Sequence, residues 1–184
     1  MRTAIRTPYY YWSGALSDDV CDLIIKEGTK LIAKPASINS DNTLDKDMRV
    51  GLISWFDENC WIEKLVVDYV GAANIEAEWK FNITGKERLQ FANYYEGAFY
   101  DWHRDCNTDS ELYRKLSVTV QLSDPKDYEG GELQILKPPT GLTKIPKKAG
   151  TLAIFDSTCY HRVTKVREGR RDALVGWVIG PRWK

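Results

Sequence analysis

The feature that most constrains the fold is a series of short β-type segments that fills the chain from about residue 79 onward. Apolar and polar residues alternate within these segments, which are rich in β-branched and aromatic side chains. Turn residues such as Asp124-Pro125 and Gly130-Gly131 separate them. The segments are residues 89–95, 115–123, 131–136, 150–155, 161–166 and 173–180. With a further short strand at residues 49–56, about seven strands are expected, which is typical of a β-sandwich or a jelly-roll barrel.

The segment before residue 79 shows the residue spacing of helices instead. Ser17 suits a helix N-cap, and two aspartates follow it in the first turn. Apolar residues three and four apart then predict a helix over residues 18–34 and a second, amphipathic helix over residues 59–79. Residues 35–48 between them are polar and rich in turn formers, so they predict a loop, long enough to act as a lid over a site.

Together these patterns predict a single domain over residues 1–184, of the mainly β, α+β class. We expect a double-stranded β-helix, that is, a jelly-roll or cupin-like barrel, over about residues 79–180. Helices within about residues 15–78 are expected to back this barrel. Hydrophobic residues make up 43% of the chain and charged residues 28%, which suits an ordinary globular protein.

Charge and cysteine content narrow the class of protein. Lysine plus arginine and aspartate plus glutamate both total 26, and zero net charge argues against a nucleic-acid-binding protein. No apolar run reaches the ~20 residues that span a bilayer, and residues 1–12 lack the apolar core of a secretory signal. The four cysteines form no C-x-x-C pair and are expected to be reduced thiols. These features predict a cytoplasmic protein without membrane contact, and no feature indicates an oligomeric state.

The chain contains only two histidines, and both lie in chemically suggestive places. His103 and Asp105 are separated by one residue at the predicted end of a strand, which puts both side chains on one face. With His161 they would supply two imidazoles and one carboxylate, the facial triad that holds non-haem Fe(II) and leaves coordination positions open. A lone H-x-D also occurs by chance, and a zinc site with these three ligands is chemically reasonable.

Arg171 is the candidate partner for an anionic cosubstrate. A dicarboxylate that chelates the metal at one end needs a fixed cation at its other end, and a guanidinium can grip a carboxylate with two parallel hydrogen bonds. Alternation along the predicted strand places Arg171, Ala173, Val175 and Trp177 on one face, and Arg170 on the other. We therefore expect Arg171 to point inward and Arg170 to be solvated.

Four stretches of the sequence, in order, resemble the prolyl 4-hydroxylase-like, 2-oxoglutarate- and Fe(II)-dependent dioxygenases, especially the compact PKHD-type hydroxylases. The likeness is densest from about residue 89 to residue 179. The stretches are YWSGALSDDVCDLI, LQFANYYEGAFYDWHRD, KLSVTVQLSDPKDYEGGELQI and AGTLAIFDSTCYHRVTKVREGRRDALVGWV. In this family the last stretch carries the pattern H-x-V-x-x-V-x-x-G-x-R, followed by a tryptophan six residues on.

The resemblance implies roles for individual residues of the metal and cosubstrate site. His103, Asp105 and His161 match the iron ligands, and Arg171 matches the residue that binds the C5-carboxylate of 2-oxoglutarate. Tyr94 matches a tyrosine that helps to hold the cosubstrate, although its ring could equally serve only for packing. Ser117 matches a small hydroxyl residue that lines the cosubstrate pocket.

A second group of aromatic residues is implied to face the substrate. Tyr100 resembles a tyrosine near the iron, Trp102 could complete an aromatic wall, and Trp177 is expected to wall the pocket or to belong to the core. Cys106 and Cys159 lie close in sequence to the ligands, where they would be either redox-sensitive or buried spectator thiols.

The implied reaction consumes O₂ and 2-oxoglutarate, hydroxylates a substrate, and releases succinate and CO₂, with ascorbate as a further cofactor that the resemblance admits. Peptidyl proline is the first substrate to expect, and a free amino acid or another small molecule is the alternative. A cupin-like metal protein without redox chemistry and a catalytically silent peptide-binding module also stay open. Zero net charge makes a nucleic-acid demethylase the less favoured reading.

Overall fold

The computed structural model describes residues 7–37, 43–106, 112–137 and 141–181. Two helices and fifteen strands are found in this part of the chain. The helices are α1 (Asp18–Gly28) and α2 (Trp61–Glu76). The strands are β1 (Tyr9–Trp12), β2 (Lys34–Pro35), β3 (Arg49–Val50), β4 (Leu52–Trp55), β5 (Gly85–Lys86), β6 (Gln90–Tyr94), β7 (Phe99–His103), β8 (Leu112–Gln121), β9 (Tyr128–Gly130), β10 (Leu133–Lys137), β11 (Gly141–Lys144), β12 (Leu152–Asp156), β13 (Tyr160–Val163), β14 (Val166–Gly169) and β15 (Arg171–Pro181).

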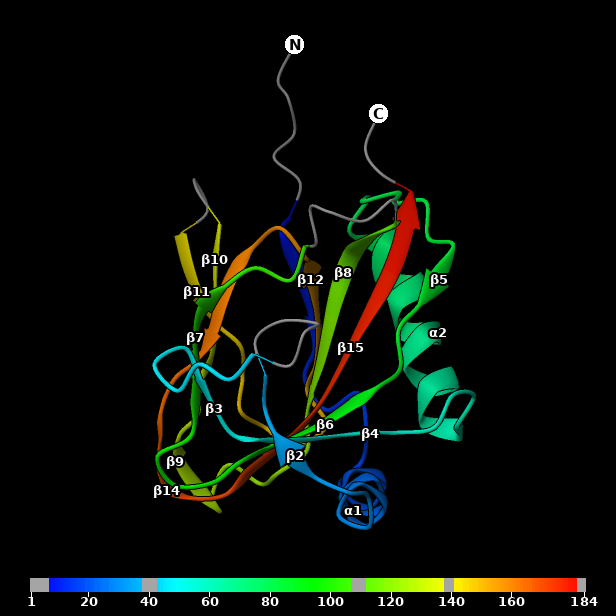
Figure 1. Ribbon diagram of the computed structural model, residues 1–184. Coiled ribbons are helices and arrows are strands. Elements are labelled where there is room, and N and C mark those ends of the chain that lie inside the picture. Colours follow the sequence, from blue (N-terminus) through cyan, green and yellow to red (C-terminus); the bar gives the residue numbers. More distant parts are fainter. Residues whose placement is uncertain (1–6, 38–42, 107–111, 138–140, 182–184) are drawn as a thin grey trace.

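The strands form two main sheets that face each other. The larger sheet has the order β1-β12-β8-β15-β6-β4-β2, with β5 also paired to β15, and the smaller has the order β11-β10-β13-β7-β3. A separate two-stranded ribbon joins β9 to β14. Figure 1 shows the smaller sheet and the helices on opposite sides of the larger sheet. The expected mainly β architecture is confirmed, but the ladders of the described residues do not close into a barrel.

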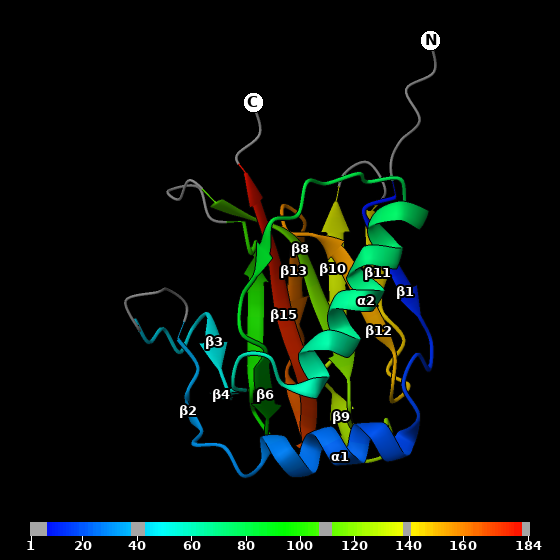
Figure 2. The same ribbon diagram turned by 90° about the vertical axis from the view of Figure 1, so that its right-hand side faces the viewer.

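Both helices pack against the outer face of the larger sheet, where α2 runs across the strands and α1 lies at one end (Figure 2). Ile62, Val66 and Val70 of α2 share one apolar cluster with Leu116 and Val118 of β8. A second cluster, which includes Ala92, Tyr94, Phe155, Leu133 and Ile135, fills part of the space between the two sheets. The larger sheet is therefore covered on both faces, which agrees with the nearly continuous apolar runs of β12 and β15.

Both helices are shorter than predicted. Ser17 caps α1 as expected, since its side chain accepts a hydrogen bond from the Val20 N–H, but α1 ends at Gly28 instead of continuing to residue 34. Pro35 disfavours helical backbone at Lys34, and these two residues instead form β2 against β4. Helix α2 is bounded by Asn59 (φ 63°) and Glu78 (φ 54°), whose left-handed backbone cannot continue a helix.

The other segments differ from prediction mainly in their short strands. Every predicted strand segment overlaps an observed strand, but β1, β2, β5, β9 and β11 were not predicted, and of β14 only Val166 lies in a predicted segment. Part of the predicted loop at 35–48 is β2, and residues 38–42 of the proposed lid lie outside the described residues. Neither of the two helices found in the described ranges is long and apolar enough to cross a membrane.

Candidate active site

The two histidines and Asp105 converge on one point between the sheets. His103 ends β7, Asp105 follows two residues later, and His161 lies on β13 directly opposite His103 in the β7–β13 pair. Nε2 of His103 is 3.6 Å from Oδ1 of Asp105, and Nε2 of His161 is 3.3 Å from Oδ2. One ligand atom from each of the three residues lies within 4.8 Å of the others, a spacing that a single metal ion can bridge.

Hydrogen bonds to the backbone fix which nitrogen of each imidazole faces this point. Nδ1 of His103 is 2.7 Å from the Asp101 carbonyl oxygen, and Nδ1 of His161 is 3.1 Å from the Cys159 carbonyl oxygen. A carbonyl oxygen only accepts, so both Nδ1 atoms donate and both Nε2 lone pairs are free for a metal. Burial lowers the pKa of His103 to about 3, with a further contribution from His161, which keeps this imidazole neutral.

The carboxylate of Asp105 is held by the neighbouring strands. The Ser117 hydroxyl donates to Oδ2 of Asp105 at 2.6 Å and lies 3.0 Å from the Ser157 hydroxyl, while the Asp105 N–H donates to the Ser157 carbonyl at 3.1 Å. Burial alone would raise the pKa of Asp105, but His161, His103 and the Ser117 hydrogen bond together lower it. An ionised carboxylate beside neutral imidazole is the protonation state that binds a divalent metal.

Ser117 therefore does not have the position that the resemblance implied. It does not line the cavity, and its hydroxyl supports the metal ligand Asp105 instead of facing a cosubstrate. Thr119, two residues further along β8, does line the cavity on the same inward face. The alternation of β8 was visible in the sequence, but which inward residue reaches the cavity depends on where Asp105 folds over the strand.

Arg171 begins β15 and is 1% exposed. Its Nη2 donates to Oε1 of Gln121 at 2.8 Å, whereas Nε and Nη1 are buried without a hydrogen-bond partner, and no carboxylate of the described residues lies within 4 Å. The guanidinium carbon is 5.2 Å from the centre of the Tyr94 ring. A buried guanidinium without a counterion is costly, so these free donors fit an anionic group of a ligand.

The backbone around Arg171 agrees with this reading. Gly131 has a φ of +59°, and a Cβ there would lie 2.9 Å from Cδ of Arg171, so only glycine leaves room for the arginine stem. Arg170, the residue before β15, is half exposed and forms an ion pair with Asp172 at 3.0 Å. The inward and outward positions predicted for the two arginines are thus the observed ones.

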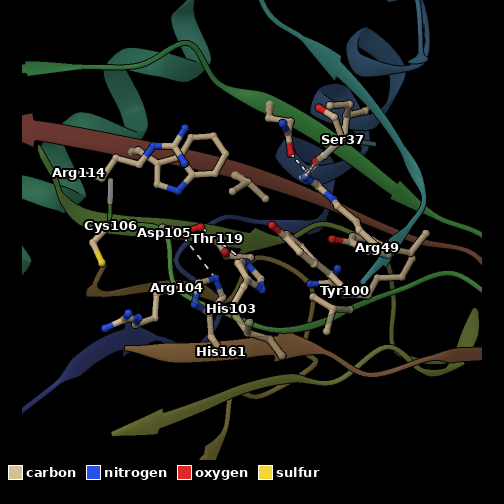
Figure 3. A pocket seen from close by; sticks show the side chains of 18 of the residues that line it. Ser37, Arg49, Tyr100, His103, Arg104, Asp105, Cys106, Arg114, Thr119 and His161 are labelled. Atoms are coloured by element: carbon tan, nitrogen blue, oxygen red, sulfur yellow. Dashed lines mark hydrogen bonds and ion pairs between the residues drawn. The ribbon is translucent and has the colours of Figure 1, made fainter. Parts of the chain in front are cut away.

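A cavity of about 630 Å³ contains the three candidate ligands and Arg171. Tyr94 and Trp177 line it, as predicted for residues near the cosubstrate and in the wall. Tyr100 lines it too and stacks on His103, with ring centres 3.5 Å apart and an angle of 13° between the planes (Figure 3). Burial raises the pKa of Tyr100 to about 12, so its hydroxyl stays protonated.

Trp102 does not contribute to this wall, which corrects the prediction. The cavity lining excludes it, and its ring instead lies under the Arg162 guanidinium at 4.6 Å. Strand alternation is the reason, because Trp102 is adjacent to His103 and therefore points to the opposite face. A β-bulge lies in the same pair: β13 advances by two residues, from His161 to Val163, while β7 runs three, from His103 to Tyr100. The extra residue brings Tyr100 to the same face as His103.

Several cavity residues were not predicted, among them Arg49, Gln90 and Arg114. Arg114 forms two hydrogen bonds of 2.6 Å with Glu87 and lies 3.9 Å from the centre of the Trp177 ring. Cys106 lines the cavity and is partly exposed, whereas Cys159 is buried. Only the inward alternation of β6 offered a signal for Gln90; nothing local marked the two arginines.

Comparison with known proteins agrees with this geometry. Residues 89–179, about half of the chain, match the family described as the 2OG-Fe(II) oxygenase superfamily. A PKHD-type hydroxylase of Parvibaculum lavamentivorans is 39% identical over 91 residues, and one of Maricaulis maris is 37% identical over 91 residues. Each match covers 50% of this chain and 41% of the relative, so the chain matches about two fifths of the length of these relatives.

Solved structures resemble the chain over nearly its whole length. A prolyl-4-hydroxylase of Pseudomonas putida has a TM-score of 0.74 at 21% identity, covering 96% of this chain and 94% of its own. The viral collagen prolyl hydroxylase of Paramecium Bursaria Chlorella virus-1, in complex with 2OG, has a TM-score of 0.74 at 23% identity, covering 95% and 97%. These likenesses establish the double-stranded β-helix fold. From the family match, the fold and the His-Asp-His cluster together, the chain belongs to the 2OG-Fe(II) oxygenase superfamily.

Proposed function

We propose that the protein is a 2-oxoglutarate- and Fe(II)-dependent dioxygenase that hydroxylates its substrate, consuming O₂ and releasing succinate and CO₂. The observation that carries this proposal is the pairing of two features in one cavity. A cluster of two imidazoles and one carboxylate lies beside a buried guanidinium that has free donors and no carboxylate partner among the described residues. A structural zinc site would explain the first feature but would give no reason for the second.

The residues of the chain perform the holding and orienting in this proposal. His103, Asp105 and His161 would bind Fe(II) through one face and leave its other positions open. Bound there together with 2-oxoglutarate, Fe(II) supplies the O₂-dependent oxidising chemistry after which the superfamily is named. Ser117 keeps the Asp105 carboxylate in place, because its hydroxyl occupies one lone pair of Oδ2.

The cosubstrate is oriented from its far end. Arg171 would bind the C5-carboxylate of 2-oxoglutarate through its guanidinium, two of whose nitrogens, Nε and Nη1, have no hydrogen-bond partner among the described residues. Gln121 holds the guanidinium from the other side through Nη2. Tyr94 lines the same end of the cavity, below the Arg171 guanidinium. Because Arg171 would fix the C5-carboxylate, the position of the 2-oxo acid end relative to the three metal ligands would be fixed as well.

Peptidyl proline is the substrate we propose first. The curated relatives are named PKHD-type hydroxylases and the similar solved structures are prolyl hydroxylases, and the aromatic side chains of Tyr100 and Trp177 offer flat surfaces to a pyrrolidine ring inside the cavity. A free amino acid is the second candidate, because the cavity also presents arginines that a neutral prolyl ring does not need.

A turnover screen tests the proposal. Protein supplied with Fe(II), 2-oxoglutarate and ascorbate is assayed for O₂ uptake and succinate release with proline-containing peptides, free amino acids and oligonucleotides. We expect succinate release that depends on both Fe(II) and 2-oxoglutarate and that a peptide or an amino acid stimulates. Absence of any Fe(II)-dependent 2-oxoglutarate turnover, substrate-coupled or uncoupled, would contradict the proposed function.

A further inference from the structure

A second buried guanidinium faces the cavity from β3. Arg49 is 9% exposed, lines the cavity, and lies against the ring of Tyr100 at 4.4 Å from its centre. Its Nη1 donates to the Ser37 carbonyl at 2.9 Å and its Nη2 to Oε1 of Gln90 at 3.0 Å. Nε is buried and has no hydrogen-bond partner.

The charge of Arg49 is not balanced by the part of the protein that the structure describes. Both of its hydrogen-bond acceptors are neutral, and no carboxylate of the described residues lies within 4 Å. Arg114, another arginine that lines the cavity, is by contrast paired with both oxygens of Glu87. Contact with the Tyr100 ring offsets only a small part of the cost of burying an isolated charge.

Arg49 lies close to the three candidate metal ligands, on the far side of the Tyr100 ring. His103 stacks on Tyr100 with parallel planes 3.5 Å apart between centres, so His103 covers one face of the phenol ring. The Arg49 guanidinium therefore lies on the opposite face, as Figure 3 shows. A group bound by Arg49 would be separated from a metal ligand by the thickness of one aromatic ring.

The sum of the charges in the loaded cavity indicates which kind of group Arg49 binds. Asp105 is the only carboxylate among the described residues that line the cavity. Two positive charges of Fe(II) and one of Arg171 are matched by one negative charge of Asp105 and two of 2-oxoglutarate. Arg114 of the same lining is neutralised by Glu87, and Arg104 is exposed to solvent. The buried positive charge of Arg49 is then left over, so the loaded cavity is complementary to a monoanion at this position.

We propose that Arg49 binds a carboxylate carried by the primary substrate and thereby selects acidic substrates over neutral ones. This inference rests on the proposed function and adds the substrate class to it. The carboxylate could belong to a free amino acid, to the C-terminus of a peptide, or to an acidic side chain next to the oxidised residue. All three present the same two-oxygen acceptor to the guanidinium.

Matched acid and amide probes distinguish these sources. The pairs are L-proline and L-prolinamide, N-acetyl-L-proline and its amide, and an amidated peptide with Glu-Pro against the same peptide with Gln-Pro. Protein loaded with Mn(II) and saturated with 2-oxoglutarate is titrated with each probe without O₂, and binding is read from the paramagnetic broadening of the probe's proton signals. This readout reports proximity to the metal and does not need turnover.

We expect the acid member of at least one pair to bind about tenfold or more tightly than its amide, because charge-assisted hydrogen bonds are lost in the amide. The preference should disappear in Arg49→Gln and persist in part in Arg49→Lys, which keeps the charge if the glutamine variant folds poorly. Arg104→Gln, which removes an exposed arginine at the same cavity, should keep the preference.

Three results would overturn the inference: equal binding of acid and amide in all pairs, no binding of any carboxylate probe, or loss of the preference in Arg104→Gln but not in Arg49→Gln. A reduced affinity of Arg49→Gln for 2-oxoglutarate would also overturn it, since Arg49 would then belong to the cosubstrate site. If 2-oxoglutarate itself does not bind the Mn(II)-loaded wild-type protein, the proposed function fails as well; if it binds without any carboxylate preference, only the role of Arg49 fails.

Discussion

Replacement of Arg171 by methionine separates a ligand-binding role from a structural one. In the fold without cosubstrate, Arg171 is a buried cation with two unsatisfied donors. Methionine has a similar length, removes that unpaired charge, and leaves Oε1 of Gln121 without its donor. The gain from removing a buried charge offsets the ~1–3 kcal/mol cost of the unpaired acceptor, so the free energy of unfolding without cosubstrate should change little.

Cosubstrate binding should change far more. Hydrogen bonds to a charged group contribute about 1.5–3 kcal/mol each, so loss of the two-bond grip on the C5-carboxylate should cost about 3 kcal/mol, roughly 150-fold in Kd. At a 2-oxoglutarate concentration 100 times the wild-type Kd, bound cosubstrate stabilises the wild-type protein by about 2.7 kcal/mol and the variant by only about 0.3 kcal/mol. For a chain of this size the difference corresponds to a thermal shift of roughly 5–10 °C against about 1 °C.

Thermal unfolding of the Mn(II)-loaded proteins, with and without 2-oxoglutarate and in the absence of O₂, measures both quantities. Arg170→Met is the matched control, because Arg170 is the adjacent arginine and points outward to Asp172. It should keep the full shift. A full 2-oxoglutarate shift in Arg171→Met would refute the assignment of the anchor, and a large loss of stability in the cosubstrate-free variant would show that the guanidinium serves the fold.

Four further predictions concern the metal end of the cavity and its neighbours. His161→Ala should abolish Fe(II) binding, measured by anaerobic titration, and with it turnover; full activity would remove His161 from the site. Ser117→Ala frees the Asp105 carboxylate and should weaken metal affinity about 10–100-fold in the same titration, with far-UV circular dichroism unchanged. Tyr94→Phe should raise the KM for 2-oxoglutarate modestly if its hydroxyl donates to the cosubstrate, and leave it unchanged if only the ring packs. Burial lowers the pKa of His103 from 6.5 to about 3 in the metal-free fold. Between pH 6.5 and pH 3 the unfolded chain therefore binds a proton at His103 that the folded chain does not, so the free energy of unfolding falls as the pH is lowered. The urea midpoint should fall with it below pH 6.5, and less steeply in His103→Gln.

Residue spacing was enough to find the parts of the site that depend on regular strand geometry. Strand alternation along β15 assigned Arg171 inward and Arg170 outward, and both are so placed. The same rule would place Tyr100, three residues before His103, on the face opposite to His103, whereas the bulge in β7 inserts one residue and puts both on one face. A bulge depends on pairing with β13, which lies more than fifty residues later in the sequence, so no local pattern announces it.

The unpredicted parts share a physical cause as well. Arg49 reaches the cavity because its strand, β3, pairs with β7 opposite Tyr100. The sequence around Arg49 shows only an arginine at the end of a polar loop, and this local pattern does not predict the pairing with β7. Strands β2, β5 and β9 are two or three residues long, and runs so short have no readable period. The single-domain organisation and the cytoplasmic location stay predictions.

Strand β8 links the stability of the fold to the geometry of the site. Its outward residues Leu116, Val118 and Val120 belong to the apolar cluster beneath α2, whereas its inward residues are polar and support the chemistry: Ser117 holds Asp105, and Gln121 holds Arg171. Metal ligand and cosubstrate anchor are thus fixed to two points of one buried strand, and their separation follows from its 3.2–3.4 Å rise per residue. Helix α2 and its contacts with β8 therefore matter for catalysis although no residue of α2 lines the cavity, since a site of this kind tolerates displacements of only about 0.5 Å.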